Sequence, residues 1–196
     1  QSRIENGSLT YSVPIEIYGG KNGHQPALAL SYNSLMGNSI AGYGWCIGGL
    51  SYISICNSNY YYDGSNAKPA SLDKNSAYSL DGSRLIKISE TTSQINYQTE
   101  HGNVKVTLGY PTNTSAQITY PITKSVDAFG GYIDFTYLLD NNVYYVTEIK
   151  YGSNSTQYGA IKFTYQARSD VQSSYIAGRL MKDSKLLSQI DTYYQS

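Results

Sequence analysis

The stretch GYGWCIGG, residues 42–49, is the part of the sequence that comes nearest to a nucleotide-binding loop. A dinucleotide loop requires Gly-x-Gly-x-x-Gly at the start of a helix, where backbone N–H groups can approach the phosphates. Here the third glycine, Gly48, comes one residue late, and β-favouring residues follow it. Glycine also permits positive φ angles and close backbone approach. We therefore expect a structural corner, with the Trp45 ring over side-chain-free backbone, and no phosphate site.

Residues that commonly bind metal ions are few and scattered. The two histidines, His24 and His101, are far apart in the sequence and have no cysteine nearby, which argues against a zinc site. The Asp/Asn turns at 63–66 and 139–142 do not match a calcium-binding EF-hand loop. Such side chains usually bond their own backbone. We expect no metal ion and no other cofactor.

No residue pattern nominates a catalytic site. The chain lacks the Gly-x-Ser-x-Gly sequence of many hydrolases. A glycosidase would need two paired carboxylates, and the spacing pairs none of the candidates, which are the aspartates and Glu5, Glu16, Glu90, Glu100 and Glu148. The sequence therefore predicts no catalytic residue and no enzyme. A hydrolase whose acidic pair or Ser-His-Asp set assembles only in space remains a third hypothesis.

Tyrosine is unusually abundant, with 22 residues against 3 phenylalanines. Its ring packs on a half-wet sheet while its hydroxyl stays in contact with water, so most of these residues fit sheet faces. The cluster Tyr60, Tyr61 and Tyr62 lies in a polar loop, where exposed rings could stack on sugars. Glycan binding by these three residues is therefore an alternative function, although covering sheet faces is the simpler role for tyrosine.

Charge and composition exclude some classes of partner. Lys plus Arg equals Asp plus Glu, 14 each, and the basic residues are scattered, so we expect no nucleic-acid binding. No run approaches the roughly 18 apolar residues of a membrane-spanning helix. Cys46 and Cys56 could close a short disulfide loop, but two small buried hydrophobic residues are the favoured interpretation.

Strand patterns dominate the elements that would position these residues. Alternating runs cover residues 10–17, 27–33, 49–55, 94–100, 103–109, 132–139, 143–151 and 160–168. Residues 77–88 form a further pair of strands around Asp81-Gly82, a dipeptide typical of tight hairpins, and His101-Gly102 joins another pair. Only residues 169–175 allow a short turn of helix. The prediction is an all-β fold with little or no helix, mostly an antiparallel curved sheet or an open β-sandwich.

With these motifs in place, the sequence resembles the N-terminal segment of SpvB/TcB-like proteins, in the Rhs/YD-repeat toxin superfamily. That family has a strand around a Pro-Ile pair, a Gly-rich turn, a LSLSYNS-like strand, a Gly-x-Gly-Trp corner and a Leu-Asp-Gly-x-Arg-Leu segment. Cys46 and Cys56 stand where members carry other residues. The positions of this chain that carry the resemblance most strongly are Pro26, Tyr32, Asn33, Gly37, Asn38, Gly42, Gly44, Trp45, Gly49, Asp81, Gly82 and Arg84.

The resemblance implies structural work. In the family, strands of YD repeats wind into a hollow shell around a toxic C-terminal polypeptide, and the N-terminal segment helps to build or close that shell. We therefore expect one all-β domain over 1–196, with a glycine/Trp corner at 28–55 and a β-meander at 78–166. It would be a fragment of a longer bacterial protein that is secreted or at the cell surface. Its partners would be further strands of its own polypeptide and a toxin cargo.

Overall fold

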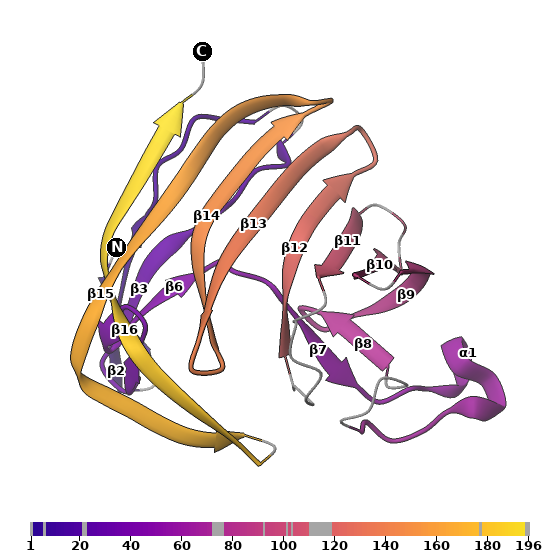
Figure 1. Ribbon diagram of the computed structural model, residues 1–196, viewed down its shortest axis with the longest axis horizontal. Coiled ribbons are helices and arrows are strands. Elements are labelled where there is room, and N and C mark those ends of the chain that lie inside the picture. The colour runs from indigo at the N-terminus through magenta and orange to yellow at the C-terminus, as the bar shows by residue number, and fades with distance from the viewer. Residues whose placement is uncertain are drawn as a thin grey trace. The chain divides into compact units, whose positions relative to one another are not determined.

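The computed structural model describes residues 2–5, 7–20, 23–71, 77–91, 93–100, 102, 104–109, 119–176 and 178–194. His101 of the predicted turn and part of the predicted loop at 57–76 lie outside these ranges. The chain divides into two compact units. Unit 1 contains residues 1–50, 131–175 and 179–196, and unit 2 contains residues 51–130 and 176–178. Each unit has its own strands (Figure 1) and its own buried hydrophobic residues.

Unit 2 contains a closed ring of six strands. From β7 to β12, each strand pairs with the next strand in the sequence. The last strand, β12, also pairs with β7, which closes the ring and leaves it without a free edge. All six pairings of the ring are antiparallel. The strands are β7 (Tyr52–Cys56), β8 (Ala77–Leu80), β9 (Ser83–Glu90), β10 (Gln94–Thr99), β11 (Val104–Gly109) and β12 (Thr119–Asp127).

Alternate residues of the strands fill the core of unit 2, because every second side chain of a strand points to the same face. Val106 and Leu108, two residues apart on β11, are 1% and 2% exposed. The remaining buried hydrophobic side chains of this unit are Ile53, Ala77, Tyr78, Leu85, Ile95, Tyr97 and Ile122. The turn between β8 and β9 follows the Asp-Gly prediction: Asp81 and Gly82 have φ angles of 48° and 87°, as a two-residue hairpin turn requires.

Few of the described residues are helical: the short α1 (Tyr60–Asp63), the 3-10 turn η2 (Gly64–Asn66) and Gly23, which has 3-10 geometry. The prediction of a short helical turn at 169–175 is wrong, because these residues belong to strand β15. No helix among the described residues has the length and apolar character needed to cross a membrane. The prediction of an all-β chain with little helix is confirmed.

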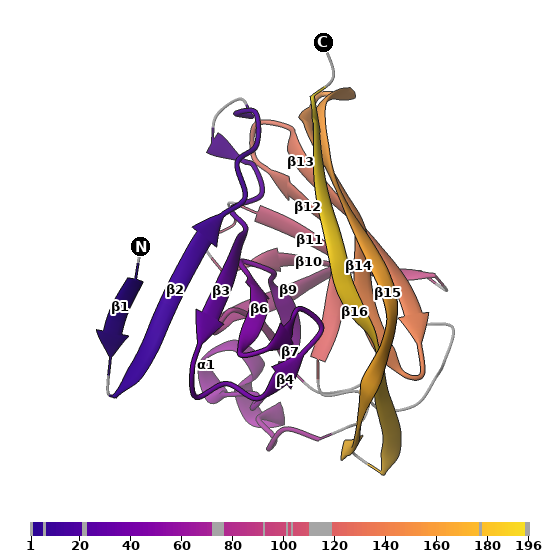
Figure 2. The same ribbon diagram turned by 90° about the vertical axis from the view of Figure 1, so that its left-hand side faces the viewer.

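Unit 1 has two sets of strands. One sheet has the order β1–β2–β3–β6 (Figure 2), and β13 to β16 lie side by side in sequence order. A two-stranded corner hairpin, residues 38–43, lies between β3 and β6 in the sequence. The strands are β1 (Ser2–Glu5), β2 (Ser8–Pro14), β3 (Ala29–Asn33), β4 (Asn38–Ser39), β5 (Gly42–Tyr43), β6 (Trp45–Gly48), β13 (Gly131–Asp140), β14 (Val143–Ser153), β15 (Thr156–Ile176) and β16 (Arg179–Tyr194).

The core of unit 1 joins these two sets of strands. Leu28 and Ile47, from the N-terminal part, pack with buried residues of β13, β14 and β15: Ile133, Val146, Ile149, Tyr151, Ile161 and Phe163. Leu187 and Ile190 of β16 pack against the same cluster. Segments from the two ends of the chain therefore complete one core, and this brings the glycine-rich corner close to β15 and β16.

Candidate functional site

Steric contacts explain two glycines of the predicted corner. Gly44 has a φ angle of 78°, and a Cβ there would lie 2.5 Å from the Tyr32 ring. Gly49 has a φ angle of 87°, and a Cβ there would lie 2.0 Å from the carbonyl oxygen of Ala27. Both positions need glycine for conformation and for space. Gly37 has open space around it and no positive φ, so neither reason applies there.

An aromatic group lies beside these glycines. The ring expected over the glycine backbone was that of Trp45, but the ring against Gly44 is that of Tyr32. Trp45 packs next to it, with its ring centre 5.3 Å from that of Tyr32 and 6.4 Å from that of Tyr11. The three rings fill the space on one face of β2, β3 and β6.

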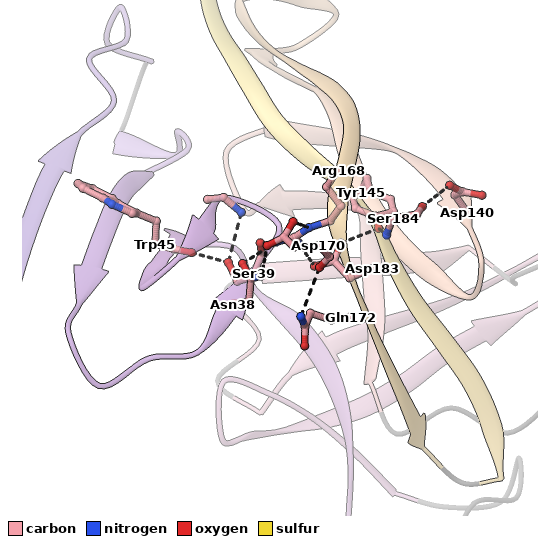
Figure 3. Close-up of polar contacts among 11 residues, drawn as sticks. Asn38, Ser39, Trp45, Asp140, Tyr145, Arg168, Asp170, Gln172, Asp183 and Ser184 are labelled. Carbon is pink, nitrogen blue, oxygen red and sulfur yellow. Dashed lines mark hydrogen bonds and ion pairs between the residues drawn. The ribbon is translucent and has the colours of Figure 1, made fainter.

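The corner hairpin is fixed by short-range hydrogen bonds. The Ser39 hydroxyl donates to the carbonyl oxygen of Trp45 and accepts from the N–H of Ala41 at 3.3 Å. Gly44 N–H donates to the Gly37 carbonyl at 3.0 Å, and Asn33 N–H donates to the Gly44 carbonyl at 2.8 Å. These bonds present the Asn38 side chain and the Ser39 carbonyl toward β15 (Figure 3).

The guanidinium of Arg168 on β15 occupies this position, with its side chain only 1% exposed. Nε and Nη2 donate to the two carboxylate oxygens of Asp170 at 3.0 and 3.2 Å. Nη1 donates to Asp183 at 2.8 Å and to the Ser39 carbonyl at 2.9 Å. Nη2 also donates to the amide oxygen of Asn38, whose nitrogen donates to Asp170. We call these five residues the arginine network (Figure 3).

The network continues into β14 and β16. The hydroxyl of Tyr145, a fully buried residue, donates to Asp183 at 2.8 Å and accepts from the N–H of Ser184 at 3.1 Å. The Ser184 hydroxyl donates to Asp140 at 2.8 Å. Leu187 N–H donates to the Ile40 carbonyl at 2.7 Å, which adds a backbone link between β16 and the corner hairpin.

The pKa shifts of Asp170, Arg168 and Tyr145 agree with this geometry. Hydrogen bonds from Arg168 and then Asn38 hold the pKa of Asp170 well below its ordinary value, and the hydrogen bond to Asp170 raises the pKa of Arg168. Burial and the bond to Asp183 raise the pKa of the Tyr145 hydroxyl. The network is therefore a cation between two carboxylates, with the neutral phenol as an additional donor.

The arginine network has the chemistry of a structural cross-link. A guanidinium offers five N–H donors, and those of Arg168 are all directed to acceptors of the protein. It has no donor left for an anionic ligand. Nor do the described parts of the chain contain a group of three or more His, Cys, Asp or Glu side chains placed to hold a metal ion. The Glu148 carboxylate, considered for catalysis, pairs with Lys150 at 2.9 Å.

A second polar cluster lies in unit 2, around the predicted residue Arg84. Its guanidinium pairs with Asp63 at 2.6 Å, lies 5.9 Å from the centre of the Tyr62 ring and contacts the Cys56 sulfur at 3.8 Å. The Tyr62 hydroxyl donates to Glu100, and this bond raises the pKa of Tyr62. These contacts fix α1 on the strands of unit 2.

The predicted glycan-contact residues divide into two groups. Tyr60 and Tyr61 are 76% and 88% exposed, whereas Tyr62 is 39% exposed and engaged with Arg84 and Glu100. The polar side chains of the loop mostly bond within it: the Asn59 amide oxygen caps α1 at Tyr62 N–H, and the Ser58 hydroxyl donates to the Lys68 carbonyl. Two rings therefore project from an ordered loop.

The other predicted residues take simpler places. Pro26 is buried, and the Asn33 side chain accepts from Leu35 N–H at 2.9 Å. A Cβ on Gly42 would touch Leu186 at 3.7 Å, and Asp81 accepts from the Ser51 hydroxyl at 2.6 Å. Cys46 and Cys56 are both free and only half-buried, and burial raises the pKa of the Cys46 thiol.

Sequence reasoning missed the centre of the network. Asn38 was included, but Arg168, Asp170, Asp183 and Tyr145 were not. One signal was present: Arg and Asp two residues apart in a strand share a face, and can form a bidentate pair. The acceptors on the corner hairpin could not be inferred, because they lie 129 and 130 residues away in the sequence.

The corner and the strands around it are similar to parts of known proteins. Residues 3–58 match the family model described as Salmonella virulence plasmid 65kDa B protein, SpvB. The fold is similar to the N-terminal domain of effector protein SpvB from Salmonella typhimurium strain LT2, with a TM-score of 0.66 and 16% identity over 95% of this chain and 88% of that chain. The resemblance to SpvB/TcB-like proteins is confirmed.

Two toxin structures contain the same fold as this SpvB-like chain. The Photorhabdus luminescens Tc holotoxin pore matches with a TM-score of 0.66 and 15% identity, and the TcdB2-TccC3 structure with 0.61 and 16%. Each match covers 96% of the SpvB-like chain. The chain spans only 13% of the length of either toxin chain. No curated protein sequence matches it.

Proposed function

We propose that the SpvB-like chain is a structural segment of a longer bacterial toxin-type polypeptide of the Rhs/YD-repeat kind. It would help to build or close a shell around a C-terminal toxic polypeptide, in a protein that is secreted or displayed at the cell surface. The proposal includes no reaction, metal ion, cofactor or nucleic acid. The observation that carries it is the similarity of almost the whole chain to the SpvB N-terminal domain and to part of two Tc toxin chains.

The arginine network supports a scaffolding role. Its buried cation uses its donors to join β15 to β16 and to the corner hairpin. Removing one partner of such a buried pair is costly, typically about 3–5 kcal/mol, because the other charge remains without compensation. A polar network that holds several strands together is what a scaffolding segment requires.

The test is protease protection in the full-length polypeptide. We expect the C-terminal polypeptide to resist digestion when residues 1–196 are intact, and to be cleaved when they are deleted or when Arg168→Ala weakens them. Arg179→Ala is the matched control, since Arg179 makes one 3.3 Å hydrogen bond to Asn142 in the same unit. Equal resistance with and without residues 1–196 would contradict the proposal.

Glycan binding remains a second candidate because Tyr60 and Tyr61 are strongly exposed on an ordered loop. Stacking of a sugar ring on these side chains would use their apolar faces. A glycan array probed with the wild type and with Tyr60→Ala/Tyr61→Ala decides this. Binding that the double substitution abolishes supports the candidate, and an array without hits removes it.

A further inference from the structure

One face of the β1–β2–β3–β6 sheet is apolar along its whole width. Leu9, Tyr11 and Val13 alternate along β2 and so share a face. The antiparallel register places Ile4 of β1 opposite Leu9, and Leu30 of β3 opposite Val13. Residues directly opposite one another lie on the same side of a sheet. Since Leu30 packs against the core of unit 1, this apolar face is continuous with that core.

The cover over this face stops partway across the sheet. Ile47, on β6, is 9% exposed, but exposure rises to 39% at Val13, 43% at Tyr11, 49% at Leu9 and 78% at Ile4. Strands β1 and β2 therefore extend the core-facing surface beyond the strands that cover it. We call Ile4, Leu9, Tyr11 and Val13 the overhang patch.

The opposite face of β2 shows that the patch is not ordinary solvent-facing surface. Positions 8, 10 and 12 carry the hydroxyl residues Ser8, Thr10 and Ser12, of which Ser8 is buried, Thr10 half-buried and Ser12 exposed. Apolar and polar residues therefore alternate along β2, as in a strand that has its apolar face on a core. The pattern continues along β2 even where the apolar side is exposed, so its sequence matches a surface that is covered when the protein functions.

The size of the patch favours a modest occupant. From their exposures, the four side chains present about 400 Å² of surface, within the range of about 300–600 Å² typical of the largest patch on a monomer. A stable dimer buries about 800 Å² on each partner, so the patch supplies only half of what a second copy needs. One strand or hairpin with an apolar face would cover it.

We infer that the overhang patch is the docking surface for an apolar strand or hairpin of the same polypeptide, outside residues 1–196. This inference rests on the proposed function, in which the SpvB-like chain is one segment of a longer chain. The Tc toxin chains that contain this fold are several times longer, since the fold spans 13% of each. The occupant extends the core of unit 1 over β1 and β2.

Cysteine labelling tests the inference. In a background with Cys46→Ser and Cys56→Ser, the probe variants are Leu9→Cys and Val13→Cys on the patch, and the control is Ser12→Cys on the opposite face of β2. Each is labelled with a maleimide in the 196-residue chain and in the full-length polypeptide, with circular dichroism confirming the strand content. We expect both patch cysteines to react at least tenfold more slowly in the full-length polypeptide, and the Ser12→Cys control to react within twofold in both.

Three outcomes would overturn the inference. Equal labelling in both forms would show that nothing covers the patch. Protection that appears in the 196-residue chain as its concentration rises would assign the patch to a second copy, and equal protection of the Ser12→Cys control would indicate non-specific burial. Failure of the proposed function is separate: patch protection in the full-length polypeptide, without any effect of residues 1–196 on protease resistance, would refute the shell role and leave the docking surface in place.

Discussion

Gly49 and Gly37 of the corner have different steric surroundings, so a single added methyl group distinguishes their roles. We expect Gly49→Ala to destabilise the protein by at least about 2 kcal/mol, because the new Cβ would meet the Ala27 carbonyl at 2.0 Å and the φ angle of 87° disfavours alanine. Urea unfolding followed by Trp45 fluorescence measures this. Gly37→Ala is the control and should change stability by less than about 0.5 kcal/mol. Equal effects of the two substitutions would refute the steric explanation.

The carboxylate of Asp170 should make stability depend on pH in the acid range. Its pKa is lower in the folded protein, where Arg168 and Asn38 donate to it, than in the unfolded chain. The unfolded chain therefore takes up the proton first, and the stabilisation present at neutral pH is lost as pH falls below the ordinary pKa of about 4. We expect the Tm of Asp170→Asn to be lower than that of the wild type at pH 7, and to fall less between pH 5 and pH 2. Parallel Tm curves would contradict this role of Asp170.

Among the elements, the arginine network should hold the corner hairpin to β15 and β16. We expect Arg168→Ala to cost about 3–5 kcal/mol, because Asp183 and the Ser39 carbonyl lose their buried donor. Hydrogen exchange should accelerate most at residues 38–43 and 183–187. Arg179→Ala should leave both segments protected. Acceleration spread evenly over unit 1 would indicate general loosening, with no specific link at Arg168.

The strands were predictable from sequence where alternation or turn chemistry was strong. The run YIDFTYLL lies within β13, and Asp81-Gly82 correctly located a hairpin turn. The outer part of β15 was not predictable, because residues 169–176 are exposed on both faces and carry no alternation. The short α1 was missed as well. Its stability comes from local caps, the Asn59 oxygen at Tyr62 N–H and the Asp63 oxygen at Asn59 N–H, in a segment without helical periodicity.

The candidate site was predictable only in its local half. Glycine spacing indicated the corner, since positive φ and close contact are properties of a few neighbouring residues. Arg168 was not identified, because a buried guanidinium needs acceptors from several strands, and sequence separation hides which strands meet. Tyr62 shows the same limit: its place in a tyrosine run suggested exposure, but Arg84 and Glu100 engage it.

At the scale of the whole molecule, two separate cores raise the question of whether the chain unfolds in one step. Ile149 in unit 1 and Val106 in unit 2 are 0% and 1% exposed. We expect Ile149→Ala to cost about 2–5 kcal/mol, since it removes several buried methyl and methylene groups. Exchange should then accelerate in the strands of unit 1, with those of the six-stranded ring still protected. Equal acceleration in both units would instead support the prediction of a single domain over 1–196.

The order of segments in unit 1 has a consequence for synthesis. Residues 1–50 belong to a core that is completed only by residues 131–175 and 179–196. Asn38 leaves the ribosome 130 residues before Arg168, which is on the order of 10 s at a translation rate of about 5–20 residues per second. During that interval the six strands of unit 2 emerge, while the N-terminal strands, which pair with one another, still lack the later strands that complete their core. The nascent chain should therefore be a client of ribosome-associated chaperones from the emergence of residues 1–50 until β15 and β16 arrive.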